Sequence, residues 1–287
     1  MGRRWRAWLV SVILMTVAAL ALPGASSAGS AGLTAVPVNT RAMWVWDDGS
    51  AADVVTWAAR HGVSEIFAYV SPSILTNGGL ARLQQMKQRA DSWKIKLRAL
   101  GGDSSWTTDH AAALAWQKTV VLTGLFDGIH LDVEPYLTVG WGDDLQATER
   151  SYLQLLDKMR AAGKLGVEAD VPFWFGQYQV GGKNLADEVL KRVNAVTVMS
   201  YRDTATGPNS MLAVSQDWLV RGAAAGKRVR LGAETGRLAD CGYCTFREEG
   251  AAAMDRELTK VDAGTRRSGA FGGIAIHWYG GWRALPA

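Results

Sequence analysis

The segment FDGIHLDVEPY (residues 126–136) places three acidic residues and a histidine inside an apolar run that has the character of a β-strand. Because side chains alternate between the two faces of a strand, His130, Asp132 and Glu134 share one face, and the apolar residues between them share the other. A buried carboxylate is costly unless it is paired. The pattern therefore predicts a strand whose apolar face packs on helices and whose polar face points into a closed barrel.

Seven similar runs accompany this one, and helical patterns lie between them. We expect strands at 42–48, 65–71, 94–103, 126–135, 164–175, 195–203, 228–236 and 272–282. Ser50 and Gly62 are typical of the start and end of a helix after the first strand, and Thr245 with Glu248 forms a capping box before a late helix. Eight strand–helix units predict an α/β fold, the (β/α)8 TIM barrel. A doubly wound sheet would usually carry a glycine-rich phosphate loop after its first strand, and residues 46–49 (WDDG) lack one.

The first 28 residues have the pattern of a secretory signal peptide. Arg3, Arg4 and Arg6 precede a 16-residue apolar run at 7–22, and small residues at 25–28 offer a cleavage site. A membrane anchor is the alternative, but the run is short for a span of about 20 residues. We therefore expect a secreted, extracellular protein with no membrane association after cleavage.

The remaining chain fits one domain, with an N-terminal segment at 29–41 and a barrel at 42–287. Only five residues follow Trp282, so we expect the full last helix to be missing, and the N-terminal segment to cover either that gap or the bottom of the barrel. Without the signal peptide, 28 basic residues face 27 acidic ones, a net charge of +1. This balance does not indicate a nucleic-acid groove. We expect a monomer.

Cys241 and Cys244 form a CGYC sequence late in the chain. A redox motif would need a reactive thiolate, usually at a helix start in a thioredoxin-like unit. An exported protein more often closes such a pair into a disulfide. We expect the disulfide, since a zinc site would also need further ligands nearby.

Acids and tryptophans gather at the expected C-terminal strand ends, where TIM-barrel enzymes place their active sites. Eleven of the 13 tryptophans lie outside the signal peptide. Indole faces can stack on sugar rings and carboxylates can accept hydrogen bonds from sugar hydroxyls, although such aromatic residues can also be structural. We therefore expect the protein to bind a carbohydrate polymer or oligosaccharide and to use no metal or other cofactor. The candidate substrate-binding residues are Trp46, His130, Asp170, Trp174, His277 and Trp278.

The two acids at the end of the fourth strand are candidates for acid–base chemistry. Asp132 and Glu134 lie two residues apart on one face, so their charges repel and one holds its proton longer. A protonated Glu134 could protonate a leaving oxygen, as glycosidic cleavage requires. The alternative is a salt-bridged barrel interior with no chemistry.

The same stretch resembles the fourth-strand signature of glycoside hydrolase family 18, the chitinases and endo-β-N-acetylglucosaminidases, which reads D-G-x-D-x-D-x-E. Asp127, Gly128, Asp132 and Glu134 match this signature, whereas His130 stands where the family has its middle aspartate.

Two later segments extend the resemblance. VMSYRD (residues 198–203) is similar to the family's sixth-strand Met-x-Tyr-Asp, with Met199 and Tyr201 matching and Arg202 in place of the aspartate. Trp278 matches the tryptophan of the family's last strand. The resemblance implies a substrate-assisted mechanism, in which the substrate's own N-acetyl oxygen attacks the anomeric carbon. Glu134 would be the general acid/base, while Asp132 and Tyr201 would hold the acetamido group.

Two other hypotheses remain open. Glu234 ends the seventh strand and could be the nucleophile of a retaining glycosidase, about 5–5.5 Å from Glu134. It could equally be the structural partner of an arginine such as Arg202 or Arg237. Because His130 and Arg202 replace two acids of the family pattern, a catalytically silent glycan-binding barrel is the third hypothesis.

Overall fold

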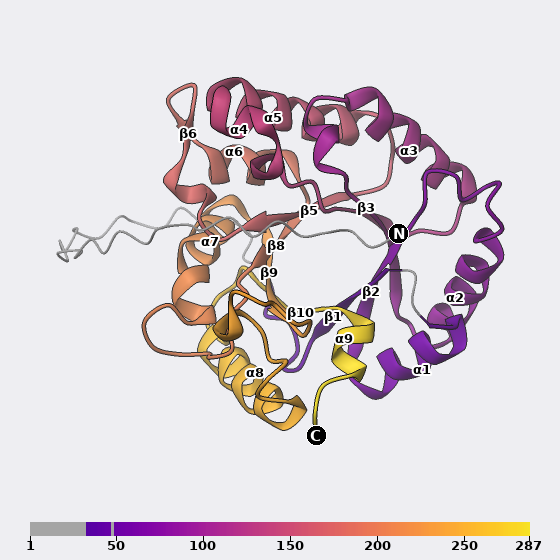
Figure 1. Ribbon diagram of the computed structural model, residues 1–287, viewed down its shortest axis with the longest axis vertical. Coiled ribbons are helices and arrows are strands. Elements are labelled where there is room, and N and C mark those ends of the chain that lie inside the picture. Colours follow the sequence, from indigo (N-terminus) through magenta and orange to yellow (C-terminus); the bar gives the residue numbers. More distant parts are fainter. Residues whose placement is uncertain (1–32, 47–48) are drawn as a thin grey trace.

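The computed structural model describes residues 33–46 and 49–287, which form a closed barrel of eight parallel strands (Figure 1). The strand order around the barrel is β1-β10-β9-β8-β5-β4-β3-β2. The strands are β1 (Arg41–Val45), β2 (Val63–Tyr69), β3 (Lys96–Gly101), β4 (Gly128–Leu131), β5 (Val167–Pro172), β8 (Ala195–Met199), β9 (Arg228–Glu234) and β10 (Phe271–His277). Each overlaps one expected strand, which confirms the (β/α)8 TIM barrel.

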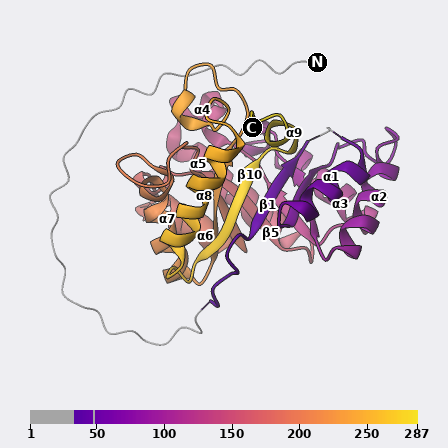
Figure 2. The same ribbon diagram turned by 90° about the horizontal axis from the view of Figure 1, so that it is seen from below.

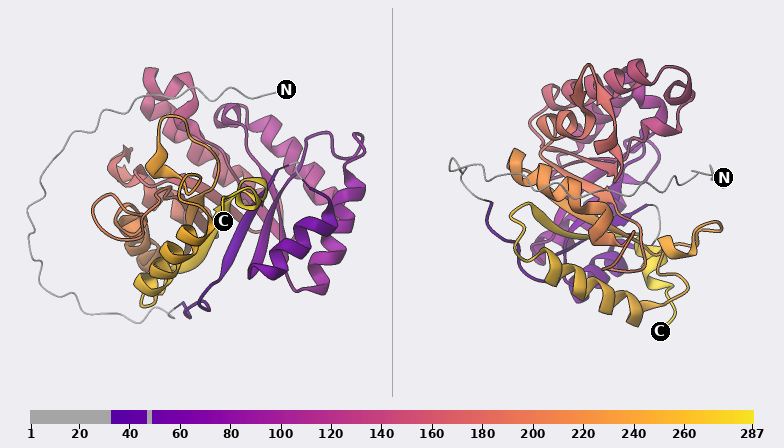
Figure 3. Two further views of the ribbon diagram at one scale, coloured as in Figure 1. Left: turned by 60° about the horizontal axis from the view of Figure 1, so that its bottom comes forward. Right: turned by 90° about the vertical axis from the view of Figure 1, so that its left-hand side faces the viewer.

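Helices surround the barrel on its outer side, as Figures 1 and 3 show from several directions. The longer helices are α1 (Ala51–Arg60), α2 (Leu80–Ser92), α3 (His110–Thr123), α5 (Leu145–Ala161), α6 (Leu185–Arg192), α7 (Met211–Ala225) and α8 (Ala251–Thr265). The short elements are η1 (Ser104–Thr107), η2 (Pro135–Leu137), α4 (Val139–Asp143), η3 (Phe175–Gln177), the β6 (Gln179–Val180) and β7 (Lys183–Asn184) hairpin, η4 (Gly242–Cys244) and α9 (Tyr279–Arg283). The five-residue α9 follows β10 in the described part of the chain.

The two expected helix starts have different outcomes. Ser50 caps α1, because its hydroxyl accepts a hydrogen bond from the Asp53 amide. The capping box at Thr245 is wrong, since α8 begins only at Ala251. The Thr245 hydroxyl instead donates to the Gly236 carbonyl over 2.7 Å and ties the β9–α8 loop back to the end of β9.

The described part of the N-terminal segment lies at the N-terminal end of the barrel. Residues 35–38 line a hollow together with Asp262 and Phe271, at the end of α8 and the start of β10. Arg41 forms a 2.7 Å ion pair with Asp262 beside it. In Figure 2 this segment and α9 lie at opposite ends of the barrel strands, so the segment is near the barrel bottom and away from the α9 side.

The predicted signal peptide, residues 1–28, lies outside the described residues, as do Asp47 and Asp48. In the described part of the chain, no helix combines the length and apolar character needed to span a membrane.

The lower interior of the barrel holds a buried ring of alternating charges, here called the charge ring: Glu65, Arg98, Glu168 and Arg230. Glu168 lies 3.1 Å from Arg98 and 2.8 Å from Arg230, and Glu65 bonds both arginines. Burial raises the pKa of Glu168, but the charge of Arg230 and its other partners more than offset this and hold it well below its usual range. Two positive and two negative groups cancel, which makes their burial tolerable.

Gly128, the second residue of the family-like signature, belongs to this ring's packing. A Cβ atom at this position would lie 2.1 Å from an Arg98 guanidinium nitrogen. The glycine therefore leaves space for Arg98 to reach its two carboxylates.

Candidate active site

His130 lies in the barrel interior, directly above the charge ring, with a fully buried side chain. Its Nε2–H donates to Asp170 Oδ1 over 2.8 Å, and its ring stacks on Phe67 at a centroid distance of 3.6 Å. Burial lowers the pKa of His130, but the charge of Asp170, the hydrogen bond to Asp170 and the nearby Glu168 carboxylate more than offset this and raise it. A histidine at this position thus supplies a donor and a flat ring where an aspartate would supply neither.

Asp170 shares this middle layer and is also buried. Its second carboxylate oxygen accepts a hydrogen bond from Trp44 Nε1 over 3.1 Å. Its hydrogen-bond partners are therefore His130 and Trp44. Asp170 and His130 therefore lie in the barrel interior, below the strand ends that carry Asp132 and Glu134.

Asp132 and Glu134 follow the end of β4 and are half-buried, in contrast to His130. Gly102, from the end of β3, packs so closely that a Cβ atom there would lie 2.0 Å from the Asp132 carbonyl oxygen. Glu134 begins the η2 turn, where Pro135 ends the extended backbone. The end of β4 thus brings both carboxyl groups to the C-terminal end of the barrel.

Tyr201, which follows β8, is the point at which the candidate catalytic residues meet. Burial raises the pKa of its hydroxyl well above the usual value, and the charges of Glu234, Asp170, Asp132 and Glu134 raise it further, in that order. The negative charges of four carboxyl groups at three strand ends thus act on one phenol, which stays protonated and can donate a hydrogen bond. The structure brings together all four candidate catalytic residues.

The Glu234 carboxylate is buried and accepts three hydrogen bonds. One oxygen accepts from the backbone amides of Thr235 and Gly236, over 2.7 and 2.6 Å, and the other accepts from His277 Nδ1–H over 2.8 Å. Trp46 donates its indole N–H to His277 Nε2 over 3.2 Å, which assigns the His277 proton to Nδ1 because an indole can only donate. Strands β1, β10 and β9 are thereby joined by the chain Trp46–His277–Glu234.

Of the two alternatives for Glu234, the structural pairing with Arg202 or Arg237 is not observed, and the ion-pair partner of Glu234 among the described residues is His277. Burial lowers the pKa of His277, but the charge of Glu234 and the hydrogen bond to it more than offset this and raise it. Sequence reasoning placed both residues at strand ends but did not pair them.

The candidate sugar-binding tryptophans lie in different surroundings. Trp278 is half-buried beside His277 and covers Gly236, where a Cβ atom would lie 2.4 Å from the indole ring. Trp174 lies in an aromatic cluster that sequence reasoning missed, at centroid distances of 5.2 to 6.4 Å: Tyr136, Trp141, Trp174, Phe175 and Tyr178. The aromatic density of FWFGQY (residues 173–178) was the available signal.

Tyr136 connects this cluster to the carboxyl groups. Burial raises the pKa of Tyr136 well above its usual value, and the charge of Glu134 and a hydrogen bond to it add to the effect. Through Tyr136, the aromatic cluster therefore lies beside Glu134.

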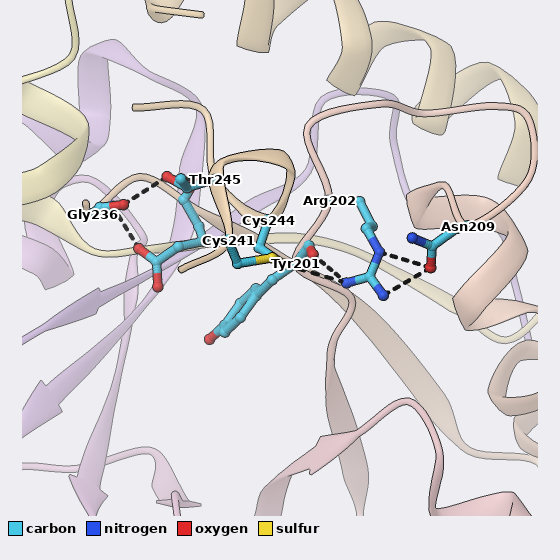
Figure 4. The surroundings of a disulfide bond; sticks show 8 residues. Tyr201, Arg202, Asn209, Gly236, Cys241, Cys244 and Thr245 are labelled. Atoms are coloured by element: carbon cyan, nitrogen blue, oxygen red, sulfur yellow. Dashed lines mark hydrogen bonds between the residues drawn. A yellow bond between two sulfur atoms is a disulfide. The ribbon is translucent and has the colours of Figure 1, made fainter. Parts of the chain in front are cut away.

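Cys241 and Cys244 form the expected disulfide, in the loop between β9 and α8 (Figure 4). Figure 4 also shows the Tyr201 ring directed away from the Arg202 guanidinium, as adjacent extended residues require. In residues 33–46 and 49–287, no group of three or more histidine, cysteine, aspartate or glutamate residues is arranged to hold a metal ion.

Comparison with known proteins finds similarity in structure alone. No protein-family model matches the sequence, and no curated protein matches it. The spore cortex-lytic enzyme SleL of Bacillus cereus aligns with a TM-score of 0.55 at 10% identity, over 87% of this chain and 74% of that one. SleL of Bacillus megaterium aligns with a TM-score of 0.52 at 11% identity, over 85% and 71%.

A chitinase of Chromobacterium violaceum aligns less well, with a TM-score of 0.47 at 14% identity, over 69% of this chain and 68% of that one. At such identities the similarity establishes the fold. The chain therefore shares the barrel fold of the two cortex-lytic enzymes, in agreement with the fold implied by its resemblance to glycoside hydrolase family 18.

Proposed function

We propose that the protein is a secreted glycosidase that cleaves a glycosidic bond in a glycan of 2-acetamido sugars, with Glu134 as the general acid/base. The observation that carries this proposal is that Asp132 and Glu134 follow the C-terminal end of β4 and Tyr201 follows that of β8, with one strand, β5, between these two in the barrel. The secretory part of the proposal rests on the signal pattern of residues 1–28.

The arrangement suits the substrate-assisted route. The acetamido oxygen of the substrate attacks the anomeric carbon, and the bond to the leaving oxygen breaks as Glu134 gives that oxygen a proton. Asp132 accepts a hydrogen bond from the acetamido N–H and keeps the oxygen pointed at the anomeric carbon. Tyr201, whose high pKa keeps its proton in place, donates to the acetamido oxygen. Glu134 then takes a proton from the water that opens the intermediate.

The environment of Glu234 argues against the two-carboxylate alternative. A nucleophile must leave one oxygen lone pair directed at the anomeric carbon. Glu234 is buried, and three donors from fixed backbone and His277 hold its two oxygens. We assign it a positioning role, in which it orients His277 and, through His277, the Trp46 indole.

The position of Arg202 argues against a silent site. An arginine beside Glu134 would lower the pKa of that carboxyl group and weaken it as an acid. The Arg202 guanidinium instead lies between the rings of Phe173 and Tyr243. The two Bacillus neighbours are named spore cortex-lytic enzymes, which supports a lytic activity for this chain.

A matched pair of substrates tests the proposal. We expect the protein to release reducing ends from a β-1,4-linked oligomer of N-acetylglucosamine and not from a glucose oligomer of the same length and linkage. A Glu248→Gln variant, changed at an exposed residue of the β9–α8 loop, should behave as wild type. Equal cleavage of both oligomers would contradict substrate assistance, and cleavage of no amino-sugar glycan would contradict the proposed activity.

A further inference from the structure

Arg202, at the rim beside Tyr201, is held by neutral groups. Its Nε and one terminal nitrogen donate to the Asn209 side-chain oxygen over 3.0 and 2.9 Å, and the other terminal nitrogen donates to the Tyr201 carbonyl over 2.6 Å. Its guanidinium carbon lies 5.0 Å from the centre of the Phe173 ring and 5.5 Å from that of Tyr243. These contacts fix the guanidinium plane without neutralising its charge.

Within the described ranges, no carboxylate lies within ion-pair distance of Arg202, whereas Arg41, Arg98 and Arg230 are each paired with an acid. Burial lowers the pKa of Arg202, and the nearby Tyr243 and Asp203 offset this only in part. A half-buried cation without an ion pair is costly. The cost is understandable if an anion from outside the chain completes the site.

The surrounding loop is built to hold this arrangement. The disulfide between Cys241 and Cys244 closes a short loop around Tyr243, whose carbonyl accepts a hydrogen bond from the Asp203 amide over 3.0 Å. Asn209 adopts a left-handed backbone conformation with φ of 56°, which asparagine tolerates better than most residues. Figure 4 shows Arg202 between the disulfide of the β9–α8 loop and Asn209 of the loop before α7.

We propose that Arg202 binds a carboxylate carried by the substrate, so that the natural glycan is an acidic one in which 2-acetamido sugars bear a carboxyl group. This inference rests on the proposed glycosidase function and specifies its substrate class. A guanidinium presents parallel N–H groups that match a carboxylate, and fixing it in advance reduces the ordering cost of binding. Tyr201 and Arg202 are adjacent and point to different sides. The acetamido group and the carboxylate would therefore be bound on different sides of the same strand end.

The test compares binding of one glycan in two forms, using the Glu134→Gln background so that the glycan stays intact. The probe is a peptide-free strand of alternating N-acetylglucosamine and N-acetylmuramic acid, either as the free acid or with every carboxyl group converted to its methyl ester. Calorimetry at pH 7 should give a Kd for the free acid about tenfold or more below that for the ester, in line with a charge-assisted hydrogen bond.

The variant Arg202→Gln should bring the two Kd values within about twofold of each other, and Arg202→Lys should keep part of the preference because it retains the charge but not the fork. Arg237→Gln removes an exposed arginine from the β9–α8 loop and should keep the full preference. The proposal is overturned if Arg202→Gln keeps the preference, if it weakens both forms equally, or if the background protein shows no preference or binds neither form.

This experiment separates the carboxylate site from the proposed activity. Binding needs no turnover, so a preserved preference in a protein that hydrolyses nothing would leave the Arg202 site standing and remove the glycosidase function. Hydrolysis of neutral amino-sugar oligomers without any preference for the free acid would do the reverse.

Discussion

Replacing His130 by aspartate would restore the acid that the family signature carries, yet we expect it to destabilise this protein strongly. The change removes a charge-assisted hydrogen bond to Asp170 and the stack on Phe67, and it places a second carboxylate beside Asp170 in the barrel interior. Leaving a buried charge without its partner costs about 3–5 kcal/mol. For a domain of this size, that loss corresponds to a fall in Tm of roughly 6–20 °C.

Urea unfolding at pH 7, followed by tryptophan fluorescence, measures this loss. His130→Gln keeps an N–H donor for Asp170 and should lose less stability than His130→Asp. The double variant His130→Asp/Asp170→Asn removes the charge of residue 170 and with it the repulsion between the two carboxylates, so it should recover part of the loss. At pH 4 the gap between His130→Asp and wild type should narrow, because a protonated carboxyl group can donate to Asp170. A His130→Asp variant within about 1 kcal/mol of wild type at pH 7 would refute this reasoning.

Three further changes probe other parts of the account. Arg230→Met leaves the two carboxylates of the charge ring with one arginine and should lower the unfolding free energy by about 3–5 kcal/mol in urea titrations. Burial raises the pKa of Glu149 to about 7, so ionisation of this carboxyl group reduces the stability of the fold as pH rises from about 4.5 through 7. Glu149→Gln should therefore raise Tm by about 2–4 °C at pH 8 and leave it unchanged at pH 4. Gly102→Ala would force the Asp132 backbone to move and should lower kcat/KM about 100-fold. Gly142→Ala is the control, because a Cβ atom there meets no atom within 4 Å and should not change kcat/KM. Unchanged kinetics in Gly102→Ala would contradict the close packing of Gly102 against the Asp132 carbonyl.

The barrel could be predicted from sequence because its signals are local. Each strand is a short β-rich run, and caps such as Ser50 act within one helical turn. The failure at Thr245 has a long-range cause. Its hydroxyl bonds the Gly236 carbonyl at the end of the preceding strand, a contact nine residues away that competes with the capping box and delays α8 to Ala251.

The members of the site could be predicted, but their partners could not. Glu134 and Tyr201 were identifiable because they follow β-rich runs and match a known signature. The pairing of Glu234 with His277 depends on the register between β9 and β10, where these two residues are direct neighbours. Register between parallel strands is decided by the closure of the whole barrel, so no single segment carries it. The charge ring was invisible for the same reason, because it joins four strands.

The most direct test of the central claim is hydrolysis by Glu134→Gln, compared with wild type on one N-acetylglucosamine oligomer. Glutamine keeps the shape of the side chain but cannot transfer a proton, so we expect kcat to fall about 10²–10⁴-fold. Tm should be unchanged, and the Kd for the oligomer should stay within about twofold of wild type. A Glu134→Gln variant that hydrolyses the oligomer at the wild-type rate would contradict the assignment of Glu134 as the general acid/base.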